Sequence, residues 1–420
     1  MSLGNLERNL VFSLSAPRMF GHVEKLCEFG PRYIGSEAAE KTIAYLEAEL
    51  ARFGAKVERC PFEISHFQEI GSELKLLFPQ ERGFECQANY RSVSTPEGGI
   101  VADRIVDVGY GTEEEFQGKD LNGTMALATD GRVRLSNLVD SAQKRGAVGC
   151  IVVRRRPDGL ISTHGLHRHG APIPAVSIRH RDGQVLRDLA RQGPIQVFMK
   201  VQTDLERGQA DNLLGILEGQ GNPEEVWAIV AHYESLPHTP GANDNASGVA
   251  VALEMLRAFS SLRLSRTLWF IFSTGHEGGM MGMFDFVEQR KKDLRRIRGL
   301  INLDEVGQGP ILRALKYGEL VPGIEVATSE HLNSVLLGAA EDLGYQLDNS
   351  YTSRVGGLAD AHPFAEAGVP VAWLSKGVSA ALYGHTAEDT PDTIEVNALK
   401  IPADILAVSL LRLDGDGEEI

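Results

Sequence analysis

The chain has 420 residues, about twice what one hydrophobic core usually serves, so two domains are expected. Hydrophobic residues make up 43% and charged residues 24%, a balance that is ordinary for a soluble globular protein. The formal net charge of −15 argues against nucleic acid or an anionic membrane as a partner, because both are polyanions. No apolar run reaches the roughly 20 residues that a membrane-spanning helix needs.

The N-terminal stretch and the cysteines indicate the compartment. MSLGNLERNLVFSLSAPRMF has no basic segment followed by a continuous apolar one, so we see no signal peptide. The spacing of Cys27, Cys60, Cys86 and Cys150 resembles neither a CxxC metal clamp nor a disulfide framework. We therefore expect free thiols and a cytoplasmic protein, with an exported form that has lost its signal as the alternative.

The predicted elements begin with two helices and a strand. After Ser36, which suits an N-cap, apolar residues recur at helical spacing as far as Phe53, and Gly54 then ends the helix. The stretch AKVERCPFEI that follows is typical of a strand.

The rest of the chain divides into two regions. Residues 65–205 show short strands, glycine turns and one helix, which indicates a small β-rich domain. From residue 210 onward, apolar strands alternate with helices, among them 247–259 and a helix near 331–343. This α/β alternation predicts a mostly parallel central sheet with helices on both faces.

Five imidazole or carboxylate side chains stand where the predicted strands of the second region end. Because binding sites in parallel α/β sheets form beyond the carboxyl ends of the strands, we expect these side chains to meet at one edge. They are His232, ending VWAIVAH; Asp244, in the loop before helix 247–259; Glu277, after FIFST; Asp304, ending LINLD; and His385, after VPVAWLS.

These residue types suit zinc and similar divalent ions. Three carboxylates against two dications leave one positive charge, which a bridging hydroxide neutralises, so the set fits two ions. Metals about 3.5–4 Å apart need a shared bridge, and Asp244 is our choice for it. Singly, each residue is most simply a surface or turn residue, but the five together favour a metal site.

The same motifs resemble the co-catalytic di-zinc aminopeptidase family, zinc exopeptidases related to glutamate carboxypeptidase II. The resemblance rests on PGANDNASGVAVALEMLR, FIFSTGHEGGMMG, INLDEVG and GHTAEDTPDTI. DVGYGTEEEFQGKDLNG, AQKRGAVGCIVV and IPAVSI resemble the protease-associated (PA) domain that is often inserted in such enzymes. The resemblance implies a catalytic domain of residues 1–62 and 206–420, with a PA-like insert of residues 63–205 beside the cleft.

The resemblance also implies how the ligands divide between two metals. One zinc takes His232, Asp244 and Asp304, and the other takes Asp244, Glu277 and His385. In the family mechanism zinc polarises the scissile carbonyl and acidifies a bridging water, and a carboxylate carries the proton to the leaving amine. The implied substrates are small peptides or aminoacyl amides.

His276 stands where the family normally has that proton-carrying Glu. As a proton shuttle, an imidazole with an unperturbed pKa of ~6.5 suits neutral pH, and two nearby dications favour its neutral, basic form. If His276 is a further metal ligand, no residue fills the proton-shuttle role. If the general base is lost at this position, the protein has weak or no peptidase activity. We expect His276 in the catalytic machinery, together with Glu234 as the acceptor that orients His232.

Three other residues are candidates for substrate binding or for support of the metal ligands. Tyr383 is one place further from His385 than the family's tyrosine, with Gly384 between them. Glu305, where the family often has an apolar residue, adds negative charge near the metals. Asp360 resembles an acidic residue of the family's Ser-Asp motif.

Two segments remain outside this scheme. HGLHRH, residues 164–169, has three histidines but no accompanying carboxylate or cysteine, so a loop that closes over the cleft is a better interpretation than a metal site. The basic runs 154–156 and 290–298 are most simply solvated faces.

The sequence therefore favours a zinc-dependent aminopeptidase that hydrolyses small peptides with a metal-activated water. One alternative is a metal-binding or scaffold pseudo-peptidase whose general base is lost. Another is a non-peptide amidohydrolase or an acyl transferase of the glutaminyl cyclase kind.

Overall fold

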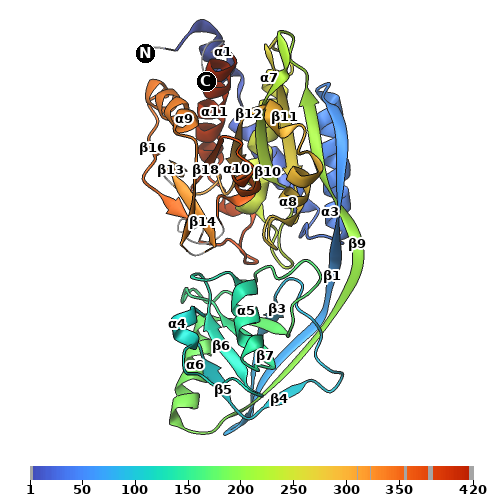
Figure 1. Ribbon diagram of the computed structural model, residues 1–420, viewed down its shortest axis with the longest axis vertical. Helices are drawn as coiled ribbons and strands as arrows, with labels where there is room; N and C mark the ends of the chain where they lie inside the picture. The colour runs from blue at the N-terminus through green and yellow to red at the C-terminus, as the bar shows by residue number, and fades with distance from the viewer. Residues whose placement is uncertain (1–2, 310, 322, 354–356, 377–381, 416–420) are drawn as a thin grey trace.

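The computed structural model describes residues 3–309, 311–321, 323–353, 357–376 and 382–415. The described residues form a larger and a smaller body, shown above and below in Figure 1. Two long antiparallel strands, β1 (Lys56–Phe78) and β9 (Gln196–Leu217), run from one body into the other (Figure 1). The first and the last helices, α1 (Asn5–Ser13) and α11 (Lys400–Gly415), both lie on the larger body (Figure 1).

A ten-stranded sheet has the strand order β16-β13-β18-β12-β10-β11-β9-β1-β2, with β4 also paired to β9. Its central strands β18, β12, β10 and β11 are parallel, as the sequence predicts, whereas the pairs toward β9 and between β13 and β18 are antiparallel. The remaining bounds are β2 (Arg82–Phe84), β4 (Ile100–Ala102), β10 (Asn222–His232), β11 (Arg266–Ser273), β12 (Ile297–Leu303), β13 (Leu312–Ala314), β16 (Leu347–Asp348) and β18 (Val371–Ser375).

Helices cover both faces of the central strands. In β10, Trp227 and Ile229 pack into one core while Ala228 and Val230 pack into the other, which is why this strand is continuously apolar. The first core holds α1 (Asn5–Ser13), α2 (Ala16–Glu28), α3 (Glu37–Arg52), α7 (Ser247–Phe259), α9 (Glu330–Leu343) and α11 (Lys400–Gly415). The second core holds α8 (Met281–Gln289) and α10 (His362–Glu366).

The smaller body contains a five-stranded sheet of order β3-β8-β7-β6-β5, parallel except for β3. The sequence indicated one helix here, whereas the described residues form three. Inside one of these helices, Gly183 allows a close approach to Val153, since a Cβ at this position would lie 2.3 Å from that side chain. The bounds are β3 (Cys86–Ala88), β5 (Ile105–Asp107), β6 (Met125–Thr129), β7 (Gly149–Val153), β8 (Ala175–Ile178), α4 (Glu113–Phe116), α5 (Leu135–Lys144) and α6 (His180–Gln192).

The expected insert boundaries fall inside the two connecting strands. Phe62 pairs with Ala210 and Phe67 with Leu205, and the ladder continues on both sides of these pairs. Because these strands belong to both bodies, the backbone shows no break at residues 62/63 or 205/206. The insert boundaries 63–205 therefore stay a prediction.

Smaller features complete the fold. A three-stranded sheet joins β15 (Ile324–Ala327), β14 (Tyr317–Val321) and β17 (Thr352–Ser353). The four cysteines are free thiols, as expected. Among the described residues, no helix combines the length and the apolar character needed to cross a membrane.

The N-terminus of α7 packs closely against the end of β12. A Cβ on Gly248 would lie 2.5 Å from the carbonyl oxygen of Leu303 and 2.5 Å from Oδ1 of Asn245. Glycine at this position therefore lets the loop before α7 lie against the strand that leads to Asp304.

We expect Gly248→Ala to lower the free energy of unfolding by about 1–3 kcal/mol, because the added methyl group overpacks this contact. Gly338→Ala on α9 is the control, since the nearest atom to its Cβ is 3.8 Å away. Alanine should there raise stability by up to about 1 kcal/mol. Urea unfolding measures both values, and equal stabilisation by the two substitutions would contradict the predicted close contact.

Candidate metal centre

The structure brings the five predicted ligands together at the carboxyl edge of the central parallel strands. His232 is the last residue of β10, and Asp304 directly follows β12. Glu277 lies in the turn after β11, Asp244 in the turn before α7, and His385 in the segment that follows β18. The five residues therefore come from separate segments, and the central sheet, covered by helices on both faces, fixes the positions of these segments relative to one another.

The ligand atoms form two groups that share one carboxylate. Nε2 of His232 lies 3.2 Å from Oδ1 of Asp244 and 3.3 Å from Oδ1 of Asp304. Nε2 of His385 lies 3.3 Å from Oδ2 of Asp244 and 3.4 Å from Oε2 of Glu277. Asp244 thus presents one oxygen to each histidine.

These separations fit a bound metal ion. Zinc binds nitrogen and oxygen ligands at about 2.0–2.2 Å in a tetrahedron, whose ligand-to-ligand edge is then about 3.3–3.6 Å. Four of the five side chains are less than 10% exposed, whereas that of His385 is 31% exposed, so most of the ligands are held in place by the surrounding protein. The donor types and their spacing therefore suit a divalent cation such as zinc.

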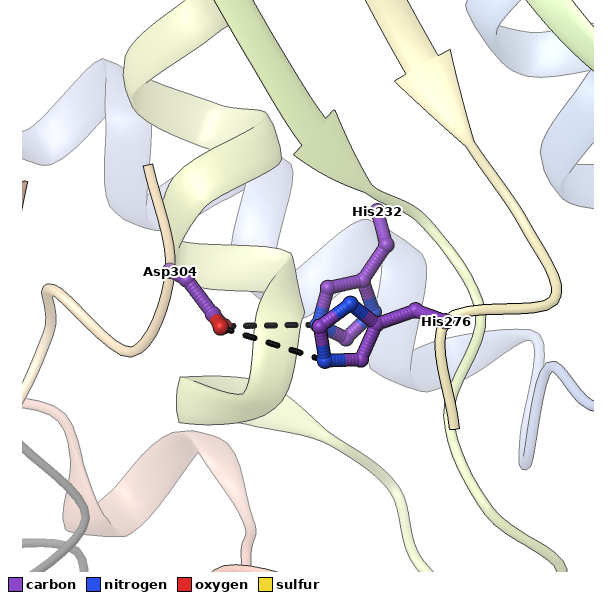
Figure 2. A group of neighbouring side chains, drawn as sticks. All are labelled: His232, His276 and Asp304. Atoms are coloured by element: carbon purple, nitrogen blue, oxygen red, sulfur yellow. Dashed lines mark hydrogen bonds and ion pairs between the residues drawn. The ribbon is translucent and has the colours of Figure 1, made fainter. Parts of the chain in front are cut away.

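His276 stacks on His232, with ring centroids 3.9 Å apart and an angle of 3° between the planes. Figure 2 shows both rings facing the carboxylate of Asp304. Nδ1 of His276 lies 3.1 Å from Oδ1 of Asp360, and its Nε2 lies 4.0 Å from Oδ2 of Asp304. Asp360, whose other oxygen accepts a hydrogen bond from Ser273 at 2.5 Å, thus anchors the outer side of the ring.

Glu234 acts on different groups from those we expected. Its backbone carbonyl, and not its carboxylate, lies 3.2 Å from Nδ1 of His232. The carboxylate accepts hydrogen bonds from the backbone N–H of Glu277 at 2.7 Å and from the hydroxyl of Thr274 at 3.1 Å. The longer side chain of Glu, compared with Asp, reaches the turn after β11 and holds it.

Two residues for which the sequence predicted no role hold the Asp244 loop. Asp389 accepts hydrogen bonds from the backbone N–H groups of Asn243 at 2.9 Å and Asp244 at 3.0 Å, and burial raises its pKa to about 6. The buried guanidinium of Arg32 donates to the carbonyls of Tyr233 and Gly241. The position of Asp389 in HTAED, four residues after the histidine ligand, was the available signal for its role.

A cavity of about 310 Å³ lies over the ligands, between the two bodies. Glu305 and Gly384 line it, whereas Tyr383, next to Gly384, is not among the lining residues, and its role as a substrate contact stays a prediction. The run 154–156 also lines the cavity, and of its three arginines Arg155 is exposed as expected whereas Arg154 is buried. Arg154 is only 6% exposed because it pairs with Asp158, with Nη2 2.7 Å from Oδ2.

The crowding of carboxylates changes the acidity of the ligands. Burial, reinforced by the charge of Asp244, raises the pKa of Glu277 to about 7. Burial alone favours a neutral His385, but Glu277 and Asp244 outweigh it and raise the pKa of His385 to about 10. Burial and the charges of Asp244 and Asp304 raise the pKa of Glu305 well above its usual value.

This fold and this ligand set define a metal-dependent hydrolase of the α/β class. The profile of peptidase family M28 matches residues 212–410, and the profile of the PA domain matches residues 89–186. Residues 212–410 therefore form a peptidase domain of the M28 type, residues 89–186 form a PA domain, and the chain is a metal-dependent exopeptidase.

Individual relatives resemble nearly the whole chain. Aminopeptidase YwaD of Bacillus subtilis is 28% identical over 418 residues, covering 98% of this chain and 87% of that protein. The structure of BSAP, a zinc aminopeptidase from Bacillus subtilis, has a TM-score of 0.76 and 25% identity, with 97% of both chains covered. An aminopeptidase from Aneurinibacillus sp. strain AM-1 has a TM-score of 0.74 and 25% identity, covering 97% of this chain and 95% of that one.

We expect metal affinity to rise with pH between about pH 6 and 8. Glu277 holds a proton below its pKa of about 7 and His385 below about 10, and a cation must displace both protons. Each displaced proton should change the apparent affinity by roughly tenfold per pH unit. Zinc titration calorimetry in two buffers of different ionisation enthalpy measures the proton release, and a pH-independent affinity would contradict the assignment.

Proposed function

We propose that this M28 exopeptidase is a two-metal aminopeptidase that removes N-terminal residues from small peptides, with zinc as the best-suited ion. The observation that carries the proposal is the shared carboxylate of Asp244, which faces His232 with one oxygen and His385 with the other. A carboxylate that serves two ligand groups at once is what a pair of metals a few ångströms apart requires.

The ligand sets support two ions of similar character. His232, Asp244 and Asp304 would hold one, and Asp244, Glu277 and His385 would hold the other. Each set has one imidazole and two carboxylate groups, a combination that suits zinc. When bound, the metals would polarise the scissile carbonyl and lower the pKa of a water molecule.

His276 is the side chain best placed to carry the proton of that water to the leaving amine. Asp360 contacts Nδ1 and so favours the tautomer that carries its proton there, which leaves the lone pair of Nε2 facing the ligands. Asp360 and Asp304 also raise the pKa of His276 above its usual value, against the opposing effects of burial and of His232. A positioned carboxylate–imidazole pair favours a working base over a lost one.

The same geometry allows His276 a second role. Its ring nitrogen lies within 4.8 Å of ligand atoms of His232 and Asp304, close enough for the three to hold one ion. A histidine that binds the metal cannot also accept the proton through the same nitrogen, so metal content distinguishes the two roles.

The cavity supports a small substrate. Its volume of about 310 Å³ is at the lower end of the range for small-molecule sites, about 300–1,000 Å³. Walls from both bodies limit how much peptide chain can enter. The aminopeptidase names of the relatives support cleavage beside a free amino group.

Hydrolysis assays on the zinc-loaded protein test the proposal. The substrates are aminoacyl p-nitroanilides and dipeptides, and each is compared with its N-acetylated form. We expect two bound zinc ions per chain, hydrolysis of the free-amino substrates only, and loss of activity in chelator that zinc restores. One ion at saturation, or equal hydrolysis of the acetylated substrates, would contradict the two-metal aminopeptidase.

We expect His276→Ala to lower kcat by about 10²–10⁴-fold with two zinc ions still bound, because a general base contributes that much. His331→Ala, an exposed histidine on α9, is the control and should match the wild type. Zinc analysis of the same samples decides the role: a loss of one ion would identify His276 as a ligand, and an unchanged kcat would exclude it from the chemistry.

A further inference from the structure

The insert contacts the candidate ligand His385 directly. The backbone N–H of Thr163 donates to the carbonyl oxygen of His385 at 3.2 Å, and Nδ1 of His164 lies 3.3 Å from Nδ1 of His385. Arg154 Nη2 donates to the carbonyl oxygen of Leu382 at 3.0 Å. The insert therefore holds the segment of His385 by its backbone at two points and by its ring at one.

The hydrogen bonds of His164 determine the direction of this ring contact. Nε2 of His164 lies 3.3 Å from Oδ2 of Asp130, which also accepts from the hydroxyl of Ser162 at 2.8 Å. A carboxylate only accepts hydrogen bonds, so Nε2 of His164 carries the proton. In the neutral ring Nδ1 is then the acceptor, and Nδ1 of His385 must donate to it.

This direction prepares His385 for a metal. With the Nδ1 proton held by His164, the proton that a metal displaces is the one on Nε2, and the lone pair is then on the atom that faces Asp244 and Glu277. Metal-binding histidines usually donate their other N–H to a partner that fixes the tautomer and the ring orientation. Within the described part of the chain, His164 is the hydrogen-bonding partner of that Nδ1 atom.

The two candidate ligand histidines are held by different parts of the protein. Nδ1 of His232 faces the carbonyl of Glu234, two residues along in its own segment. Nδ1 of His385 faces a residue that is 221 positions away and belongs to the insert.

We propose that His164 is a positioning residue of the metal centre, through which the PA insert orients His385 and strengthens one of the two metal sites. This inference rests on the proposed function, since it requires His385 to bind a metal. The insert is then a structural part of the active site and does more than limit its entrance.

The test measures zinc affinity of the full chain by competition with a chromogenic chelator. His164→Ala should weaken one of the two ions by about 10–100-fold and leave the other unchanged, because only one histidine loses its partner. The weakened ion should be the one that His385→Ala loses outright, as judged by the spectrum of the cobalt-substituted protein. His164→Asn, whose amide oxygen can replace the acceptor Nδ1, should restore most of the affinity.

His167→Ala is the matched control in the same loop. Its ring contacts Asp140 at 2.8 Å, and its loss should leave both zinc affinities unchanged. Circular dichroism and thermal unfolding confirm that the variants are folded, and Asp130→Asn provides a second variant because it weakens the proton anchor on His164.

The outcomes are distinct. If the His164→Ala protein binds both zinc ions with wild-type affinity, the positioning role is overturned and the two-metal proposal stands. Equal weakening of both ions also overturns it, because the effect would then be general. A wild-type protein that binds no ion at His385 overturns the proposed function and, with it, the role of His164.

Discussion

The carboxylate of Asp244 is the group on which the rest of the site depends. Its two oxygens lie 3.2 Å from His232 and 3.3 Å from His385, so one buried side chain sets the separation of both imidazoles. A buried carboxylate is costly unless it is paired or binds a metal. Behind the loop, the carboxylate of Asp389 accepts from the backbone N–H of Asp244, and Arg32 donates to the backbone carbonyl of Gly241. In front of the loop, a bound divalent cation would balance the charge of Asp244.

The arrangement of the two bodies follows from the same constraint. The central sheet brings the ligands of the larger body to one edge, but the segment of His385 lies beyond the last central strand, β18. The long pair β1 and β9 carries the insert back to this edge, where Arg154 and His164 contact that segment (Figure 1). The insert thereby encloses the cavity and contributes to the centre within it.

Much of the larger body could be predicted because burial leaves a clear pattern. Strands β10 and β11 are apolar on both sides, and the ligands stand at their ends, where the pattern stops. Helix 247–259 was predicted with its observed bounds. The role of Glu234 could not be predicted, since it depends on the turn after β11 folding back within 2.7 Å of its carboxylate. The sequence predicts Arg154 as a surface residue, because the spacing of charges does not show that it pairs with Asp158 and lines the cavity.

The sequence by itself determined the class of fold and the chemical nature of the site, because the period of apolar residues and the ligand types at the strand ends are local properties of the chain. The tertiary structure decided which atoms face one another. The two carboxylate oxygens of Asp244 face different histidines only because the turn before α7 lies between the segments of both. The contact of His164 with His385 joins positions 221 residues apart. No local pattern encodes such contacts, because the hydrogen bonds that fix them form only after the sheet and the insert have packed together.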